Sequence, residues 1–375
     1  MSHNILILGG GLQALSTAYS LWRHGLPVIC IAPQEEEIST SRFIRHFYPI
    51  QKDTLYEQII SIVRSEQVNL IIPMSDYMAE FVSRHKSEIE SEYNCYVPVP
   101  NYKIFIQGAD KEKLMAFCEQ HGFPHPRTRT LDTSNIEEAA QYVHFPALIK
   151  PNRSVGARGI KLVYSLDELK RNYPIIHQSY GDATLQEYVD SKDTPYYNVM
   201  LYRSKNGQIT GSAIIEILRF YPIKGGSSSL CRTIEEPELL FICENILNKL
   251  NWEGMADFDV LKTPNGEYKI IEINPRVPAS LRAADIAGVN FPMIMLEQKP
   301  VEHTSYKTNQ YLRYLGLDIM WFLNSPKRFK AKPAWLFSFG ANVFFQDIFA
   351  KDPATWFSWL INGFKRFLHK RKHIQ

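Results

Sequence analysis

The stretch 254–276 constrains the fold of this 375-residue chain most, because it reads as two short strands joined by a tight turn. Residues 255–262 and 267–274 are both rich in apolar side chains that recur with a period of two, as is typical of strands. Between them lies the dipeptide Asn265-Gly266, which strongly favours hairpins. We therefore predict an antiparallel β-hairpin here and expect the rest of the fold to be organised around it.

Four oxygen-bearing side chains occupy alternate positions of this predicted hairpin. Asp257 and Asp259 share one face of the first strand, and Glu272 and Asn274 share one face of the second. If the two faces coincide, the oxygens converge on one spot next to Arg276. Such oxygens suit Mg²⁺, which proteins usually hold by one or two carboxylates together with substrate phosphates. The pattern predicts a metal site, and a solvated hairpin with ordinary surface acids is the alternative.

The sequence Glu272-Ile-Asn-Pro-Arg resembles the metal-binding signature of the ATP-grasp superfamily. The resemblance implies that Asp259, Glu272 and Asn274, with Asp257 in reserve, hold two Mg²⁺ ions on ATP, with Mn²⁺ as an alternative ion. It also implies that Arg276 stabilises the transferring γ-phosphoryl group. The first acid of the family pattern is usually Glu or Gln, so the aspartate here is a departure that leaves the role of Asp257 open.

Composition limits the classes of protein to be considered. A net charge of +3 does not suggest a nucleic-acid partner, and the length allows two or three domains. The five cysteines are scattered without a metal-type pair, as expected in a reducing compartment. The start of the chain lacks the basic region of a signal peptide, and no stretch approaches the roughly 20 apolar residues that span a bilayer. We expect a cytoplasmic protein.

Residues 1–108 read as a Rossmann-like domain. An apolar strand at 4–8 runs into a glycine turn, a helix at 12–25 and a second apolar strand at 27–32, which together predict a βαβ unit with a parallel sheet. Further helices and strands follow, the last a short strand at 95–100. The ATP-grasp resemblance implies that this lead-in domain faces the acceptor substrate through Gly10, Gly11 and Ser75-Asp76.

A dinucleotide site is the alternative for the same turn. Gly9, Gly11 and Ala14 meet the G-x-G-x-x-G/A spacing, but the acid expected at the end of the second strand is absent, since Ile31-Ala32-Pro33 stands there. An oxidoreductase that uses NAD(P) or FAD would also leave the hairpin motif unexplained.

A lysine followed by a glycine-rich loop marks residues 145–163. An apolar strand ends at Lys150, and the loop that follows contains two glycines whose backbone can approach phosphates closely. The Walker spacing is absent. The segment resembles the ATP-grasp lid, which implies that Lys150 contacts the α- and β-phosphates. The residues that would close over the triphosphate or flank the lid are Ser154, Val155, Gly156, Ala157 and Gly159.

Other nucleotide contacts follow from the same resemblance. Lys111, with Lys113 as its rival, would reach the phosphates from a helix that Asp110 caps. The segment after residue 183 resembles the hinge that holds the adenine edge, with an acid for the ribose in the following turn. The residues of this segment are Gln186, Glu187, Val189 and Asp193.

The loop at 219–234 carries Arg219, Lys224, two glycines and three serines, a composition that suits an anionic ligand. We interpret Arg219 and Lys224 as part of the phosphate and carboxylate pocket, with an exposed turn as the alternative. The helical apolar stripe at 237–252 is expected to pack under the hairpin.

Residues 301–375 are unusually aromatic and end in a basic helix predicted at 353–375. We favour packing of this helix on the protein itself or on a second subunit in a homodimer. Peripheral contact with an anionic membrane is the alternative.

These patterns predict an α/β (α+β) fold with four parts. They are a Rossmann-like pre-ATP-grasp domain at 1–108, a small lobe with the lid at 109–190, a large lobe with the metal hairpin at 191–300, and a C-terminal aromatic and basic helical extension at 301–375. The resemblance, closest to carbamoyl-phosphate-synthase-like enzymes, implies a carboxylate–amine ligase. Such an enzyme uses ATP and Mg²⁺ to form an acyl phosphate that an amine of the amino-acid or amino-sugar type attacks, releasing ADP and phosphate. A non-catalytic ATP-binding protein is the remaining alternative.

Overall fold

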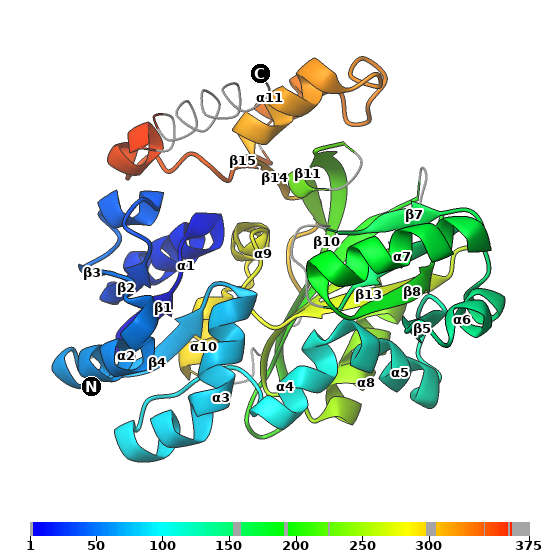
Figure 1. Cartoon of the computed structure of the whole chain (residues 1–375). Coiled ribbons are helices and arrows are strands. Elements are labelled where there is room, and N and C mark those ends of the chain that lie inside the picture. The colour runs from blue at the N-terminus through cyan, green and yellow to red at the C-terminus, as the bar shows by residue number, and fades with distance from the viewer. Residues whose placement is uncertain are drawn as a thin grey trace.

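Three β-sheets organise the described part of the chain, with helices packed on their faces (Figure 1). The computed structural model describes residues 3–152, 159–190, 194–223, 226–297, 305–340, 342–358 and 361. The mixed α/β class is the one predicted from the sequence.

The first sheet is parallel throughout, and three of its four strands, all except β3 (His46–Pro49), are buried along most of their length. Near-continuous apolar strands of this kind need helices on both faces. Its strand order is β3, β2 (Val28–Ala32), β1 (Asn4–Leu8), β4 (Val68–Pro73). The accompanying helices are α1 (Gly11–Arg23), η1 (Glu37–Thr40), η2 (Lys52–Thr54), α2 (Leu55–Ser65), α3 (Asp76–Tyr93) and α4 (Tyr102–Ala109).

The predicted βαβ unit is confirmed, and one predicted strand is wrong. Residues 95–100 contribute a single parallel bridge, between Tyr96 and Leu70, instead of a strand. Pro98 and Pro100 lack the N–H groups that a longer ladder requires. The strand β3, which we did not predict, takes the other edge of the sheet.

The second sheet is antiparallel and has a core of its own. Its order is β5 (Thr128–Leu131), β8 (Ala183–Glu187), β6 (Ala147–Pro151), β7 (Lys161–Val163). The neighbouring helices are α5 (Lys111–His121), α6 (Ile136–Val143) and α7 (Leu166–Tyr180). Thr128 lies opposite Gln186, so the chain enters and leaves this lobe through one pair of adjacent strands.

The third sheet has seven strands and contains the predicted hairpin. Its order is β13 (Tyr268–Asn274), β12 (Gly254–Lys262), β9 (Tyr196–Arg203), β10 (Ile209–Tyr221), β11 (Ser227–Ile234), β14 (Tyr311–Arg313), β15 (Val343–Phe345). The helices on it are α8 (Pro237–Leu250), α9 (Leu281–Ala287), α10 (Phe291–Glu297), α11 (Leu315–Asn324) and η3 (Trp335–Phe339). The stripe of α8 packs on the hairpin strands, as predicted.

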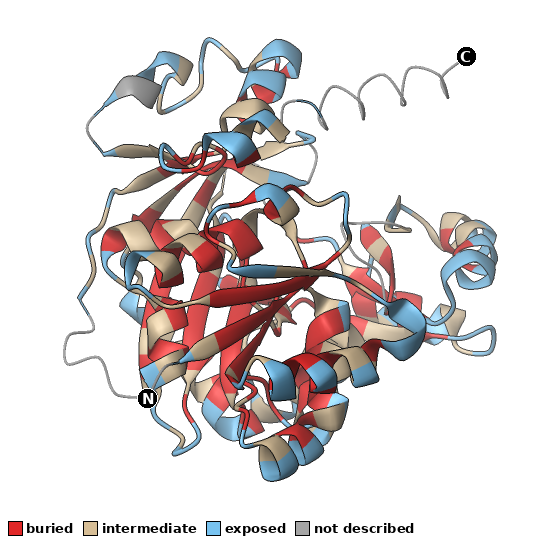
Figure 2. Cartoon of the chain, turned by 90° about the vertical axis from the view of Figure 1, so that its left-hand side faces the viewer, coloured by how far each residue is buried: buried red, intermediate tan, exposed pale blue. Residues whose placement is uncertain are grey.

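The first and third sheets share a single hydrophobic core. Buried residues of α1, β1 and β2 belong to the same cluster as residues of β9, β10 and α9. Figure 2 shows these strands as the buried interior, with exposed residues on the outer helices and loops. The second sheet has no part in that cluster, so its lobe is the separate one.

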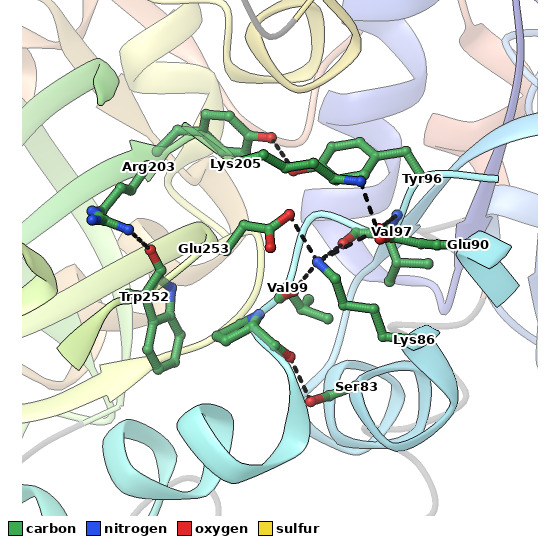
Figure 3. A network of polar contacts seen from close by, with 12 residues as sticks. Ser83, Lys86, Glu90, Tyr96, Val97, Val99, Arg203, Lys205, Trp252 and Glu253 are labelled. Atoms are coloured by element: carbon green, nitrogen blue, oxygen red, sulfur yellow. Dashed lines mark hydrogen bonds and ion pairs between the residues drawn. The ribbon is translucent and has the colours of Figure 1, made fainter. Parts of the chain in front are cut away.

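A buried lysine reinforces the junction between the first and third sheets (Figure 3). Lys86 on α3 donates to the carbonyls of Val97 and Val99 at 2.9 and 2.7 Å, and its ammonium lies 2.8 Å from a carboxylate oxygen of Glu253 in the large lobe. A buried charge is tolerated only when it is paired and hydrogen-bonded, which is the arrangement here.

The backbones of the two parts also meet at this junction. The N–H of Met255 donates to the carbonyl of Pro98 at 3.2 Å. Gly254 has φ +94°, and a Cβ atom there would lie 2.0 Å from the same carbonyl oxygen. Only glycine fits this approach.

Segments beyond residue 300 also join the large sheet, through β14 and β15. Phe349 is buried against Tyr19 and Phe43, so the extension before residue 353 packs on the N-terminal domain. Most of the predicted helix 353–375 lies outside the described residues, and its membrane contact stays a prediction. The domain boundaries also stay predictions.

No helix in the described ranges is both long enough and apolar enough to cross a bilayer.

Candidate active site

The hairpin places its four oxygen-bearing side chains as two cross-strand pairs. Asp257 lies opposite Asn274, and Asp259 lies opposite Glu272. The predicted coincidence of the two faces is therefore confirmed. The amide of Asn274 donates to Asp259 at 3.4 Å, and Asn198 of β9 donates to the other oxygen of Asp259. The neighbouring strand thus adds a fifth polar group to the same spot.

Crowding of the carboxylates perturbs their ionisation. Burial, reinforced by the negative charge of Glu272, raises the pKa of Asp259 well above its usual range. Burial raises the pKa of Asp257 to about 8, although Arg276 opposes the change. The pKa of Glu272 is lowered to about 2, because Lys111, Asp259 and Lys150 together outweigh the opposing effect of its burial. The cluster therefore carries more negative potential than its own chain neutralises, which favours a bound cation.

Two lysines, one on α5 and one on β6, face this cluster. The ammonium of Lys111, at the start of α5, lies 3.1 Å from Glu272, whereas Lys113 is exposed on the same helix. Lys150 at the end of β6 is buried and donates to the side chain of Gln186 at 2.5 Å. Burial lowers the pKa of Lys150 to about 8, and the charge of Lys111 adds to the effect. Lys150 thus brings a positive charge from the small lobe, whereas α5 packs in the same core as the hairpin.

The donor set fits Mg²⁺ bound together with phosphates. One oxygen of Asp257 is buried without a hydrogen-bond partner, as expected of a group that awaits a ligand. In the part of the chain that the structure describes, no group of three His, Cys, Asp or Glu side chains forms a preformed metal cage. That is consistent with Mg²⁺, which keeps waters and phosphate oxygens in its shell rather than a full set of protein ligands.

Arg276 connects the hairpin to the N-terminal domain. Its Nε donates to Asp76 at 3.1 Å, and its Nη2 donates to the side-chain Oδ1 of Asn274 at 3.2 Å. Asp76 begins α3 directly after β4, where the sequence places the acceptor side. The arginine is therefore held between the metal hairpin and the edge of the parallel sheet, where ligands of such sheets bind.

Of the predicted hinge residues, Gln186 and Glu187 end β8 and Val189 follows it. The N–H of Glu187 donates to the carbonyl of Arg127 at 2.8 Å, and its carboxylate accepts from the N–H of Arg127 at 3.0 Å. Val189 is buried. Gly159, at the edge of the lid, has φ +74°, and a Cβ there would lie 2.9 Å from the ring of Tyr180. These residues lie on the lobe that carries Lys150, and their roles in nucleotide binding stay predictions.

Several predicted residues lie outside the described part of the chain. They are Ser154, Val155, Gly156, Ala157, Asp193 and Lys224.

The structure gives Arg219 a different environment from the anion pocket that we predicted. Its guanidinium is buried, lies 3.1 Å from Asp318 of α11, donates to the carbonyl of Pro333, and stacks 4.6 Å from the ring of Trp321. The counter-ion is 99 residues away in the sequence, so the loop composition alone could not reveal it. Because its guanidinium is already paired with Asp318, no contact of Arg219 supports the catalytic role that we predicted for it.

Two residues of the site were missed. Asn198 and Tyr196 alternate along β9, and the pKa of Tyr196 is raised by burial and by the charge of Asp259 next to it. A polar asparagine at period two within an apolar strand was the available signal.

The glycine turn of the alternative dinucleotide site already holds a carboxylate. The N–H of Gly11 donates to Glu36 at 3.1 Å, and a Cβ at Gly10 would lie 2.7 Å from the same carboxyl group. Because a dinucleotide phosphate occupies this place at the start of the first helix, Glu36 disfavours the oxidoreductase interpretation.

Comparison with known proteins points to one superfamily. A family model described as "ATP-grasp in the biosynthetic pathway with Ter operon" matches residues 208–315. D-aspartate ligase of Enterococcus faecium is 23% identical in an alignment of 340 residues. The alignment covers 81% of this chain and 79% of that protein. The carbamoyl phosphate synthase large chain of Methanospirillum hungatei is 25% identical over 52% of this chain but only 19% of its own length, so this chain spans about a fifth of that relative.

Solved structures share the fold across most of the chain. Biotin carboxylase of Campylobacter jejuni aligns with a TM-score of 0.68 at 17% identity, over 82% of this chain and 74% of that one. N5-carboxyaminoimidazole synthetase of Staphylococcus aureus, complexed with ADP, aligns with a TM-score of 0.68 at 14% identity, over 83% and 81%.

The sequence matches, the shared fold and the acid-rich hairpin agree with one another. The 2-oxoglutarate carboxylase biotin carboxylase domain of Hydrogenobacter thermophilus, another structural neighbour, is titled as a complex with MgADP, which supports ATP and Mg²⁺ as the cofactors that the sequence predicts. The family model matched by residues 208–315, the similarity to D-aspartate ligase and carbamoyl phosphate synthase, and the shared fold together support an ATP-grasp carboxylate–amine ligase.

Proposed function

We propose that the chain activates a small-molecule carboxylate as an acyl phosphate and joins it to an amine, releasing ADP and phosphate. The observation that carries the proposal is the convergence of two lysines on the acids of the hairpin, since Lys111 of α5 lies 3.1 Å from Glu272 and Lys150 approaches from the small lobe. A site with this distribution of charge suits a triphosphate whose terminal group is transferred.

Each side chain has a role that its position suggests. Lys150 of the small lobe and Lys111 of α5 would bind phosphate oxygens, and Arg276 would neutralise the charge that develops on the transferring phosphoryl group. Asp259, Glu272 and Asn274, with Asp257 beside them, would hold Mg²⁺. When bound, the metal supplies charge neutralisation and fixes the phosphates in line with the acceptor oxygen. Positioning and electrostatics account for the rest, since no nucleophilic side chain is required.

The acceptor side is proposed to lie at the edge of the parallel sheet. Asp76 holds Arg276 there, and Glu36 fills the glycine turn close by. A carboxylate at such a place suits a protonated amine before it attacks. The relative named D-aspartate ligase supports an amino acid as one of the two substrates. A cytoplasmic location and a homodimer are part of this proposal, whereas a nucleic-acid partner is not.

The test is a screen for products. The protein is mixed with ATP, Mg²⁺ and pools of amino acids, amino sugars and amines, and nucleotides and new masses are followed together. We expect ADP, phosphate and a condensed product. Formation of AMP and pyrophosphate would overturn the acyl-phosphate route. ATP binding without turnover in any pool would favour a non-catalytic protein.

A further inference from the structure

The helix α11 exposes an apolar face on a firmly anchored platform. Its inner side carries Asp318, which is fully buried and pairs with Arg313 and Arg219 at 2.7 and 3.1 Å. Ser229 and the indole of Trp335 add hydrogen bonds to the same residue. Its outer side presents Ile319, Met320 and Leu323 to solvent, with Leu323 61% exposed. A helix that is apolar on all sides normally has its outer face covered by other protein or by lipid.

The segment after α11 extends this apolar face. Phe329 is 83% exposed, and its ring contacts Phe322 of α11 at 5.7 Å between centroids. Phe322 also contacts Trp335, which precedes the exposed Leu336. Arg328 ties the segment to the helix by donating to the carbonyl of Leu323 at 3.2 Å. The exposed side chains therefore belong to one surface rather than to scattered positions.

Positive charge surrounds this surface. Lys327, Arg328, Lys330 and Lys332 lie within six residues of one another, and no Asp or Glu occurs between residues 319 and 340. The three lysines are exposed. We define the α11 patch as Ile319, Met320, Leu323, Phe329 and Leu336 together with these four basic residues. Figure 1 shows α11 and this segment at one end of the molecule, with α8 at the other.

We propose that the α11 patch docks on an anionic lipid surface. Exposed apolar groups flanked by cations are the features that hold a protein in a membrane interface, where rings enter the headgroup boundary and basic side chains meet lipid phosphates. The composition favours lipid over a protein partner, because lysine is depleted at protein interfaces whereas long lysine side chains extend readily to headgroups. This inference is independent of the ligase reaction.

The test uses the full chain and vesicle flotation. Wild-type protein is expected to float with phosphatidylcholine vesicles that contain phosphatidylglycerol and to remain behind with pure phosphatidylcholine. The variant Lys327→Ala/Lys330→Ala is expected to lose about 30-fold in affinity, since each basic residue near an anionic surface contributes roughly a fivefold factor. Phe329→Ser is expected to lose at least about tenfold. Both variants should keep the wild-type thermal unfolding and ATP turnover.

Two controls make the result specific. Lys52→Ala/Lys249→Ala removes the same charge from exposed positions away from α11 and should float like wild type. Deletion of residues 362–375 measures the contribution of the basic terminus separately. Absence of wild-type flotation, or equal flotation of the patch variants, would overturn the proposal. So would a change of oligomeric state in Phe329→Ser with unchanged flotation, because the patch would then be a subunit interface.

Discussion

Two charge clusters of the large sheet differ in where their counter-ions come from. In the anchor cluster, Asp318 lies between Arg219 and Arg313, and these three residues all belong to the large sheet and its helix α11. In the hairpin cluster, the acids lie on β12 and β13 and Lys111 comes from α5 in the same core, but Lys150 comes from β6 of the separate small lobe. The first cluster is therefore closed within one body, and the second is shared between two.

The difference separates a structural group of charges from a functional one. A cluster closed within a rigid body cannot exchange a partner without unfolding. A cluster shared between lobes can open, admit a ligand and close again. The raised pKa of Asp259, caused by burial and by Glu272, indicates that the hairpin acids are not fully compensated by the chain alone. The part of the fold that supplies the counter-ions thus distinguishes a functional charge cluster from a structural one better than the number of charges does.

Loss of a hairpin carboxylate should have the largest effect on activity. Glu272→Ala is expected to lower kcat by at least about 10³-fold, because it removes a proposed metal ligand whose charge is needed at the transferring phosphate. ADP formation under saturating ATP measures the effect. Thermal unfolding should change little, since the same substitution relieves repulsion with Asp259.

The matched control is Glu267→Ala, which removes an exposed acid from the turn of the same hairpin and should leave kcat unchanged. Full ATP consumption by Glu272→Ala would show that the metal assignment is wrong.

Loss of the anchor carboxylate should affect stability instead. Asp318→Ala leaves two arginines buried without their counter-ion and is expected to cost about 3–5 kcal/mol in the free energy of unfolding. Urea unfolding measures it, with the exposed Asp53→Ala as the control. ATP turnover of the folded variant should remain near the wild-type value. A loss of turnover at temperatures where the variant is folded would return Arg219 to the catalytic role that its loop composition predicted.

The smallest effect concerns the pH dependence of the shared cluster. Burial and Lys111 lower the pKa of Lys150 to about 8, so the free enzyme holds this charge below that pH and loses it above. The value of kcat/KM for ATP should therefore fall about tenfold by roughly pH 9. Lys150→Arg keeps its charge, and its profile should stay flat over this range despite a lower value at neutral pH.

The exposed Lys161→Arg serves as the control and should keep the wild-type profile. A wild-type profile that is flat to about pH 10 would contradict the assignment of Lys150 to the phosphates.

Local patterns predicted the parts of the site whose geometry is local. The Asn-Gly turn fixes the register of the hairpin, and period-two spacing then puts its acids on one face. Contacts between distant segments were not accessible in this way. Lys111 and Lys113 are equivalent in sequence, and only the placement of α5 separates them. Asn198 reaches Asp259 because β9 is the neighbour of β12, which no local pattern indicates.

Contacts with distant segments also explain why the sequence alone did not reveal the environment of Arg219 or the role of the glycine turn. Arg219 was interpreted by its neighbours in the loop, yet its partner comes from α11. The turn at Gly10 and Gly11 has the spacing of a phosphate site, yet Glu36 from the next loop fills it. In both cases a charge that is remote in sequence decides the role of a motif.

Because β5 and β8 are adjacent, the small lobe resembles a domain inserted into the rest of the chain. Its first and last strands pair directly, and its core is separate from the core that joins the other two sheets. Removing the lobe would leave two chain ends about 5 Å apart, which a short turn can bridge. The lobe that carries Lys150 is therefore joined to the rest of the protein at one place, through two adjacent chain segments.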